Sequence, residues 1–148
     1  FAEKYIANFY KLFFIIRLSN VYDNSLASKG FLKNLAKATL LDNVFNVSNA
    51  QTYRNFIHVN DVVNITLMLL KKKRYGIYNA FNENFKLGQI ISLFSQIFKK
   101  KILYIDLKKS LRSDNSQKFF FTKEKKKIYK PRFFLKETIQ KFYEKYSK

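Results

Sequence analysis

The sequence predicts an α/β protein, in which short apolar strands alternate with amphipathic helices. Residues 12–18 are apolar except for Arg17, and such a continuous run is typical of a strand buried in a parallel sheet. Residues 87–98 carry apolar side chains at the period of a helix with one buried face. Only 3 Gly and 1 Pro occur in 148 residues, which disfavours a turn-rich barrel or sandwich.

The same alternation continues along the chain. Asp61 is expected to be the N-cap of the helix that follows it, and the basic residues 71–74 suit the C-terminal end of that helix dipole. Residues 119–121 could form either a strand or a packed loop. In order, we expect a helix over 1–10, a strand over 12–18, a loop over 22–29, a helix over 31–41, strands over 44–47 and 56–59, a helix over 62–70, a strand over 76–81, a helix over 87–98, a strand over 102–107 and a helix over 135–146.

The composition indicates a globular protein of one domain's length. Hydrophobic residues make up 47% of the chain and aromatic residues 18%, which is too much for a disordered protein. The absence of cysteine excludes disulfides and favours a cytoplasmic location. The longest apolar runs, 12–16 and 67–70, are far shorter than the roughly 20 residues that span a bilayer, so no membrane partner is expected.

The net charge of +19 allows two interpretations. A basic chain can bind nucleic acid, and residues 99–148 hold 17 Lys and Arg against 5 Asp and Glu. The alternative function is therefore a nucleic-acid-binding module that uses this Lys-rich C-terminal third. However, the cations are mostly Lys in a chain also rich in Asn, Ile, Phe and Tyr, which is typical of an AT-rich genome. Because Arg, the better ligand for phosphates and bases, is scarce, nucleic-acid binding is the less favoured interpretation.

Several kinds of chemistry are disfavoured by the residues themselves. Three scattered glycines cannot form a glycine-rich phosphate loop. His58 is the only histidine, so no metal site is expected, and a lone histidine in an apolar strand is more often a core or supporting group than a catalyst. Carboxylates are few and scattered, which disfavours a paired-carboxylate hydrolase.

Six segments, in order along the chain, resemble the extended short-chain dehydrogenases of the NAD-dependent epimerase/dehydratase family, which act on nucleotide sugars. The most specific is residues 51–63, which are similar to the family segment Q-T-R-x-F-I-H-V-x-D-V. The others are residues 17–22 (R-L-S-N-V-Y), 28–32 (S-K-G-F-L), 75–79 (Y-G-I-Y-N), 111–114 (L-R-S-D) and 131–139, with Pro131 and L-K-E-T-I.

The resemblance implies a fold and a domain division. Residues 1–24 and 55–82 would form the edge of a Rossmann-type domain, as the C-terminal part of its parallel sheet. Residues 25–54 and 83–148 would form a small α/β substrate lobe that binds the sugar nucleotide. A chain with this half alone should be poorly stable, since its strands would lack neighbours.

The resemblance also implies a reaction. NAD or NADP would accept a hydride from the sugar, and a Tyr in a Y-x-x-x-K pair would act as the base, giving an isomerase, lyase or reductase of carbohydrate biosynthesis. That pair and the G-x-x-G-x-x-G loop would lie upstream of Phe1. We therefore expect no catalytic residue in this chain, no activity from this part alone, and poor binding of the cofactor by it. Besides the sugar nucleotide, the expected partners are a missing N-terminal half or a second copy in a homodimer.

Three residues carry the expected contacts with a nucleoside-diphosphate sugar. By resemblance, Asn20 at the end of a strand would meet the diphosphate, and Arg54 would bind the phosphates or the nucleotide through charge-assisted hydrogen bonds. Arg112 would do the same from the C-terminal segment. Arg17 is expected to support the fold through an ion pair rather than to bind a ligand.

Overall fold

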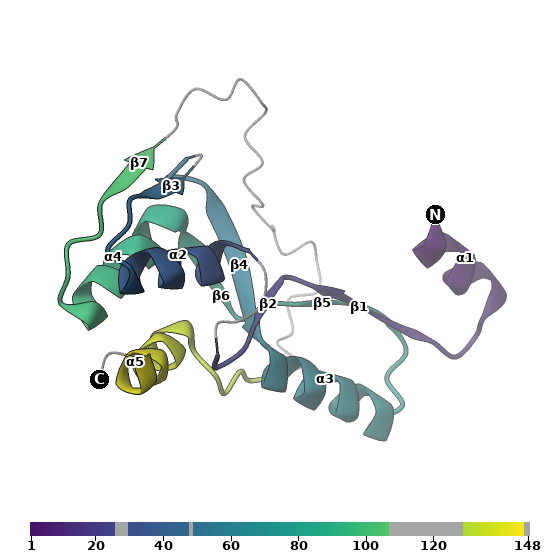
Figure 1. Cartoon of the computed structure of the whole chain (residues 1–148). Coiled ribbons are helices and arrows are strands. Elements are labelled where there is room, and N and C mark those ends of the chain that lie inside the picture. The colour runs from purple at the N-terminus through teal and green to yellow at the C-terminus, as the bar shows by residue number, and fades with distance from the viewer. Residues whose placement is uncertain (26–29, 48, 107–128, 147–148) are drawn as a thin grey trace.

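The computed structural model describes residues 1–25, 30–47, 49–106 and 129–146, and its fold is α/β as expected. Helices α2, α4 and α5 gather on one side of the strands, and α3 lies on its own along β1 and β5 (Figure 1). No described helix is long and apolar enough to cross a membrane. The helices described are α1 (Ala2–Phe9), α2 (Phe31–Leu40), α3 (Val59–Lys71), α4 (Leu87–Phe98) and α5 (Leu135–Tyr146).

Three small sheets hold the strands, and most of the pairs are parallel. Strand β1 pairs with β5 in parallel, with Phe14 opposite Gly76. The central sheet has the order β2-β4-β6, in which β2 and β4 are parallel and β6 is antiparallel to β4. Strands β3 and β7 form the third, parallel pair. The strands are β1 (Phe14–Leu18), β2 (Asn20–Tyr22), β3 (Phe45–Val47), β4 (Tyr53–His58), β5 (Gly76–Ala80), β6 (Glu83–Lys86) and β7 (Tyr104–Asp106).

The larger of two hydrophobic clusters lies between the central sheet and the three gathered helices. Its centre is α4, whose Ile90 and Phe94 are fully buried. Leu135 and Ile139 of α5 pack into the same cluster, as does Leu35 of α2. The apolar repeat over 87–98 therefore faces the core, as its period predicts.

A smaller cluster lies under α3. Ile65 and Leu69 of this helix pack against Ile57 of β4 and Ala80 of β5. Strand β4 thus contributes to both clusters, with Phe56 in the larger one and Ile57 in the smaller one. Because neighbouring residues of a strand point to opposite faces, β4 has a core on each side.

The N-terminal helix α1 buries none of its residues against the rest of the described chain. It stands apart from the other helices in Figure 1. Its last apolar residue, Phe9, remains 69% exposed. The main polar contact of α1 is an ion pair in which Arg17 of β1 holds Glu3 by two hydrogen bonds, of 2.9 Å and 2.5 Å. Arg17 thus forms an ion pair, as expected from the sequence.

Four sequence-based expectations are wrong in detail. Helix α3 begins at Val59, and its N-cap is His58, whose ring accepts the N–H of Asn60, so Asp61 is not the cap. Tyr22, expected in a loop, belongs to β2, and β4 begins at Tyr53, three residues before the expected start. Strand β6 was not expected at all, because its sequence E-N-F-K is mostly polar. The segment 119–121 lies outside the described residues.

Candidate functional site

Asn20 opens β2 at the point where the chain passes from the first sheet to the central sheet. Ser19 still bonds to β5 through its N–H, at 3.2 Å from the carbonyl oxygen of Ala80. Asn20, one residue later, is in register with Phe56 of β4. Its exposed side chain donates its amide N–H to the carbonyl oxygen of Asn55 at 2.9 Å. This bond fixes the amide against β4.

Arg54 lies near the start of β4 and is half-buried. Its Nη1 donates to the carbonyl oxygen of Tyr53 at 3.3 Å. Arg54 and Phe56 share one face of β4, and Asn20 shares the face of its partner Phe56. The register therefore places Arg54 and Asn20 on the same face of the central sheet, on neighbouring strands. Arg112, the third expected ligand, lies outside the described residues.

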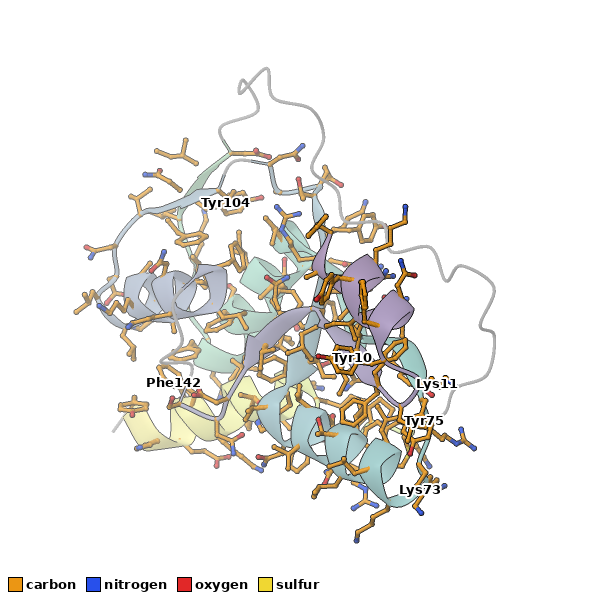
Figure 2. The ribbon with its side chains drawn as sticks, turned by 90° about the vertical axis from the view of Figure 1, so that its right-hand side faces the viewer. Tyr10, Lys11, Lys73, Tyr75, Tyr104 and Phe142 are labelled. Carbon is orange, nitrogen blue, oxygen red and sulfur yellow. The ribbon has the colours of Figure 1, made fainter. Side chains whose placement is uncertain are left out.

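The other end of the first sheet carries a basic and aromatic surface. Tyr10 and Lys11 lie at the same end of the molecule as Lys73 and Tyr75 (Figure 2). The two segments meet where the N–H of Gly76 donates to the carbonyl oxygen of Phe13 at 2.9 Å. This is the start of β1, whereas Asn20 follows its end. The charge at this surface is therefore separate from the residues expected to bind the sugar nucleotide.

Beyond Asn20, the same face of the sheet carries a cluster of buried titratable side chains. The hydroxyl of Tyr22 donates to Oε2 of Glu83 at 3.3 Å. The ring of Tyr22 meets that of His58 edge-on, with centroids 5.2 Å apart. Burial, followed by the nearby Glu83 carboxylate, raises the pKa of Tyr22 far above its usual value. Tyr22 is therefore a neutral hydrogen-bond donor rather than a base.

His58 is 1% exposed and is held as a neutral ring. Its Nδ1 accepts the N–H of Asn60 at 3.1 Å, so Nε2 carries the proton and donates to Oδ1 of Asn24, also at 3.1 Å. Burial lowers the pKa of His58. The expectation that this histidine is a core or supporting group is confirmed.

Asp61, which is fully buried, joins this cluster from the first turn of α3. Its carboxylate accepts the hydroxyl of Tyr129 at 2.6 Å and the N–H groups of Arg132 at 3.1 Å and Phe133 at 3.3 Å. A buried carboxylate is stable only when such donors replace its water. Asp61 is therefore a tie between α3 and the segment that leads into α5.

The stability of the chain is expected to depend on pH through the carboxyl group of Glu83. Burial raises the pKa of Glu83 above its ordinary 4.5, even though the N–H of Leu135 donates to it at 2.7 Å. The folded state therefore binds this proton more tightly than the unfolded state does, and stability is lost as the pH rises from 4.5 through the raised pKa.

The variant Glu83→Gln lacks this titrating group. We therefore expect its free energy of unfolding, relative to that of the unsubstituted chain, to increase as the pH rises through this range. Urea titrations of both chains at several pH values measure the difference between the two free energies of unfolding. The titration of His58 cancels from this difference, because both chains contain His58. A difference that does not change with pH would contradict the assignment.

The described residues offer no place for two kinds of group. They contain no set of three His, Cys, Asp or Glu side chains that could hold a metal ion. The three glycines lie apart, with Gly30 before α2, Gly76 opening β5 and Gly88 in α4. They form no glycine-rich turn against a helix N-terminus, so these residues do not fit the pyrophosphate of a dinucleotide.

Sequence reasoning missed two polar contacts of the cluster. Glu83 lies in the unexpected strand β6, and Asn82 just before it donates to the carbonyl oxygen of Phe133 at 2.7 Å. Both partners are about 50 residues further along the chain, with separations of 52 for Glu83–Leu135 and 51 for Asn82–Phe133. No local pattern carries such a pairing.

Comparisons with known proteins agree on one family. The family model of the NAD dependent epimerase/dehydratase family matches residues 2–82, more than half of the chain. No curated protein sequence matches the chain. Solved structures with the same fold include three nucleotide-sugar epimerases, and the chain spans about half the length of the first of them.

The three structures differ in how much of this chain they cover. UDP-glucose 4-epimerase of Thermotoga maritima, solved with UDP-glucose, has a TM-score of 0.71 and 17% identity, over 98% of this chain and 50% of that one. UDP-N-acetylglucosamine 4-epimerase of Bacillus cereus has a TM-score of 0.72 and 11% identity, over 98% and 52%. UDP-glucuronic acid 4-epimerase of Bacillus cereus, solved with UDP-glucuronic acid and NAD, has a TM-score of 0.61 and 25% identity, over 70% and 35%.

Proposed function

Because the chain belongs to the NAD dependent epimerase/dehydratase family, we propose that it is the C-terminal, substrate-binding portion of an enzyme acting on nucleotide sugars. The observation that carries this proposal is the register of β2 and β4, which puts Asn20 and Arg54 on one face of the central sheet. Two of the segments that carry the family resemblance, residues 17–22 and the most specific one, residues 51–63, contain these strands.

The proposed role of these residues is to bind and orient the substrate. The Arg54 guanidinium supplies positive charge and several N–H donors, which suit the oxygens of a diphosphate. The Asn20 amide adds a donor from the neighbouring strand.

The chemistry of the reaction belongs to parts that the described residues do not supply. In a complete enzyme, NAD or NADP would take and return a hydride, and this chain would hold the sugar nucleotide in place. We propose that residues 1–24 and 55–82 border the dinucleotide-binding domain and that residues 25–54 and 83–148 form the substrate lobe. On this proposal the chain alone is inactive.

The exposed surfaces at the N-terminal end support this division. Among the described residues, β1 pairs only with β5, so its other edge has free backbone groups. Phe1, Phe9 and Leu12, in the segment before β1, are exposed at 107%, 69% and 71%. In a complete enzyme, further chain would cover such surfaces, since this chain matches only 50% of the length of the Thermotoga maritima epimerase. The nucleic-acid alternative gains no such support from the comparisons.

Titration with UDP and with uridine tests the proposed function. Both share the base and ribose, but only UDP carries the diphosphate that Arg54 and Asn20 would bind. We expect the unsubstituted chain to bind UDP at least about tenfold more tightly than uridine, since a charge-assisted hydrogen bond is worth roughly 1.5–3 kcal/mol. Chemical shifts of the Asn20 and Arg54 amides should move during the titration. Equal affinities for the two ligands, or no binding of UDP, would refute the proposal.

A further inference from the structure

The segment 129–135 is attached to the ends of β2 and β4 by an unusual set of contacts. Exposure alternates along it, with 129, 131 and 133 facing inward and 130, 132 and 134 facing solvent. Two consecutive backbone N–H groups, of Arg132 and Phe133, donate to the fully buried carboxylate of Asp61. The hydroxyl of Tyr129 donates to the same carboxylate at 2.6 Å. Three donors of this segment, which pairs with no strand in the described part of the chain, thus converge on one carboxylate.

Further contacts on either side of Asp61 fix the same segment. The ring of Phe133 stacks on that of His58, with centroids 4.7 Å apart and planes 17° from parallel. The carbonyl oxygen of Phe133 accepts the side chain of Asn82 at 2.7 Å. The N–H of Leu135, which opens α5, donates to Glu83, and Glu83 also accepts the hydroxyl of Tyr22.

These contacts reach both strands of the proposed site. His58 is the last residue of β4, which carries Arg54, and Tyr22 is the last residue of β2, which carries Asn20. Strand β2 has three residues and lies at the edge of the central sheet. So short an edge strand depends on the packing of its side chains. The main support of Tyr22 comes from Glu83 and His58, and both of these touch the segment 129–135.

We infer that Asp61 is a positioning residue of the nucleotide-sugar site: by holding Arg132 and Phe133, it keeps β2 and β4 aligned so that Asn20 and Arg54 can bind one diphosphate. The inference rests on the proposed function, because it assumes that these two residues bind the diphosphate. Asp61 touches no ligand in this role and acts through His58, Tyr22 and the segment 129–135.

Two substitutions separate this role from simple stabilisation. Asp61→Asn keeps the size of the side chain but puts an amide N–H₂ group among three donors. Asn82→Ala removes only the bond to the carbonyl oxygen of Phe133 and serves as the milder variant. The matched control is Ile65→Val, which weakens the packing of the same helix in the smaller cluster, against which Tyr129 also packs, but leaves in place the Asp61 carboxylate, its three donors and the Asn82 bond.

The measurements are the Kd for UDP and the hydrogen exchange of the amides of Arg132 and Phe133, in the whole 148-residue chain. We expect Asp61→Asn to speed this exchange at least about tenfold and to weaken UDP binding about tenfold. Asn82→Ala should change both in the same direction by about threefold. Ile65→Val should lower the thermal midpoint and leave the Kd for UDP unchanged.

Three outcomes decide between the possibilities. Faster exchange in Asp61→Asn and Asn82→Ala with an unchanged Kd for UDP would overturn the positioning role and leave the proposed function standing. An Ile65→Val variant that loses UDP affinity as much as the other two would also overturn it, because general destabilisation would then explain the loss. If the unsubstituted chain does not bind UDP, the proposed function fails, and the positioning role fails with it.

Discussion

Replacing Phe94 with alanine is expected to lower the free energy of unfolding by about 3–5 kcal/mol. Phe94 is 0% exposed and lies on the buried face of α4, in the larger hydrophobic cluster. Its ring stacks on that of Phe98 at a centroid distance of 5.9 Å. The helices α2 and α5 pack around α4 in Figure 1, so the cavity would open where three helices meet. Since a domain is usually stable by only about 5–15 kcal/mol, this loss is a large part of the total.

The matched control for Phe94→Ala is Phe9→Ala in α1. Phe9 is 69% exposed, and its helix buries no residue against the rest of the described chain, although its ring meets that of Tyr5 at 4.5 Å. We expect a change within about 0.5 kcal/mol for this surface position. Urea denaturation of the three chains, followed by circular dichroism, measures both effects. Similar losses for the two variants would show that α1 is covered in solution or that the cluster around Phe94 is not the core.

Sequence reasoning worked where a single element carries its own signal. In α4, apolar residues recur along one face, and the helix runs from Leu87 to Phe98 as expected. The continuous apolar run that ends at Leu18 became β1, and Gly76–Ala80 became its parallel partner β5. The strand formed as expected, but the burial expected of it is not found in the described chain, because Phe14, Ile15 and Ile16 are half-buried and Leu18 is 49% exposed. The stripe of α4 and the apolar run of β1 can each be recognised without the rest of the fold.

Sequence reasoning failed where pairing between distant segments decides the structure. The polar strand β6 exists because it pairs with β4 in register, with Glu83 opposite Phe56. Asp61 had the residue type and position of an N-cap, but His58 makes the cap, and the Asp61 carboxylate turns to Arg132 and Phe133. The propensity of a local motif was overridden by tertiary contacts that no sequence pattern displays.

The same distinction applies to the proposed site. The family motifs located Asn20 and Arg54, and the register of β2 and β4 adds that the two side chains share a face. The supporting residues Tyr22, Asn82 and Glu83 became visible only through their contacts with one another and with the segment that precedes α5. The proposed ligand-binding residues thus came from a motif, whereas the residues that support them came from contacts between distant segments.

The variant Arg54→Ala is expected to weaken UDP binding roughly 10- to 100-fold, as loss of a charge-assisted hydrogen bond costs about 1.5–3 kcal/mol. Because the guanidinium would bind the phosphates, the affinity for uridine should not change. The UDP affinity of Arg54→Lys should lie between that of the unsubstituted chain and that of Arg54→Ala, since lysine keeps the charge and loses the planar set of donors. Isothermal titration of UDP and uridine into the unsubstituted chain and the two variants measures the six affinities that this comparison needs.

The arginine control is Arg17→Ala, which removes the same charge from β1. Arg17 is engaged with Glu3 on the surface, where ion pairs are weak, so we expect at most a small effect on UDP affinity and on stability. If Arg17→Ala weakens UDP binding as much as Arg54→Ala does, the attraction comes from the net charge of +19 rather than from one residue. If Arg54→Ala weakens uridine and UDP equally, Arg54 contacts the nucleoside or supports the sheet. A loss confined to UDP and to position 54 would tie the diphosphate to the face of the sheet that β2 and β4 share.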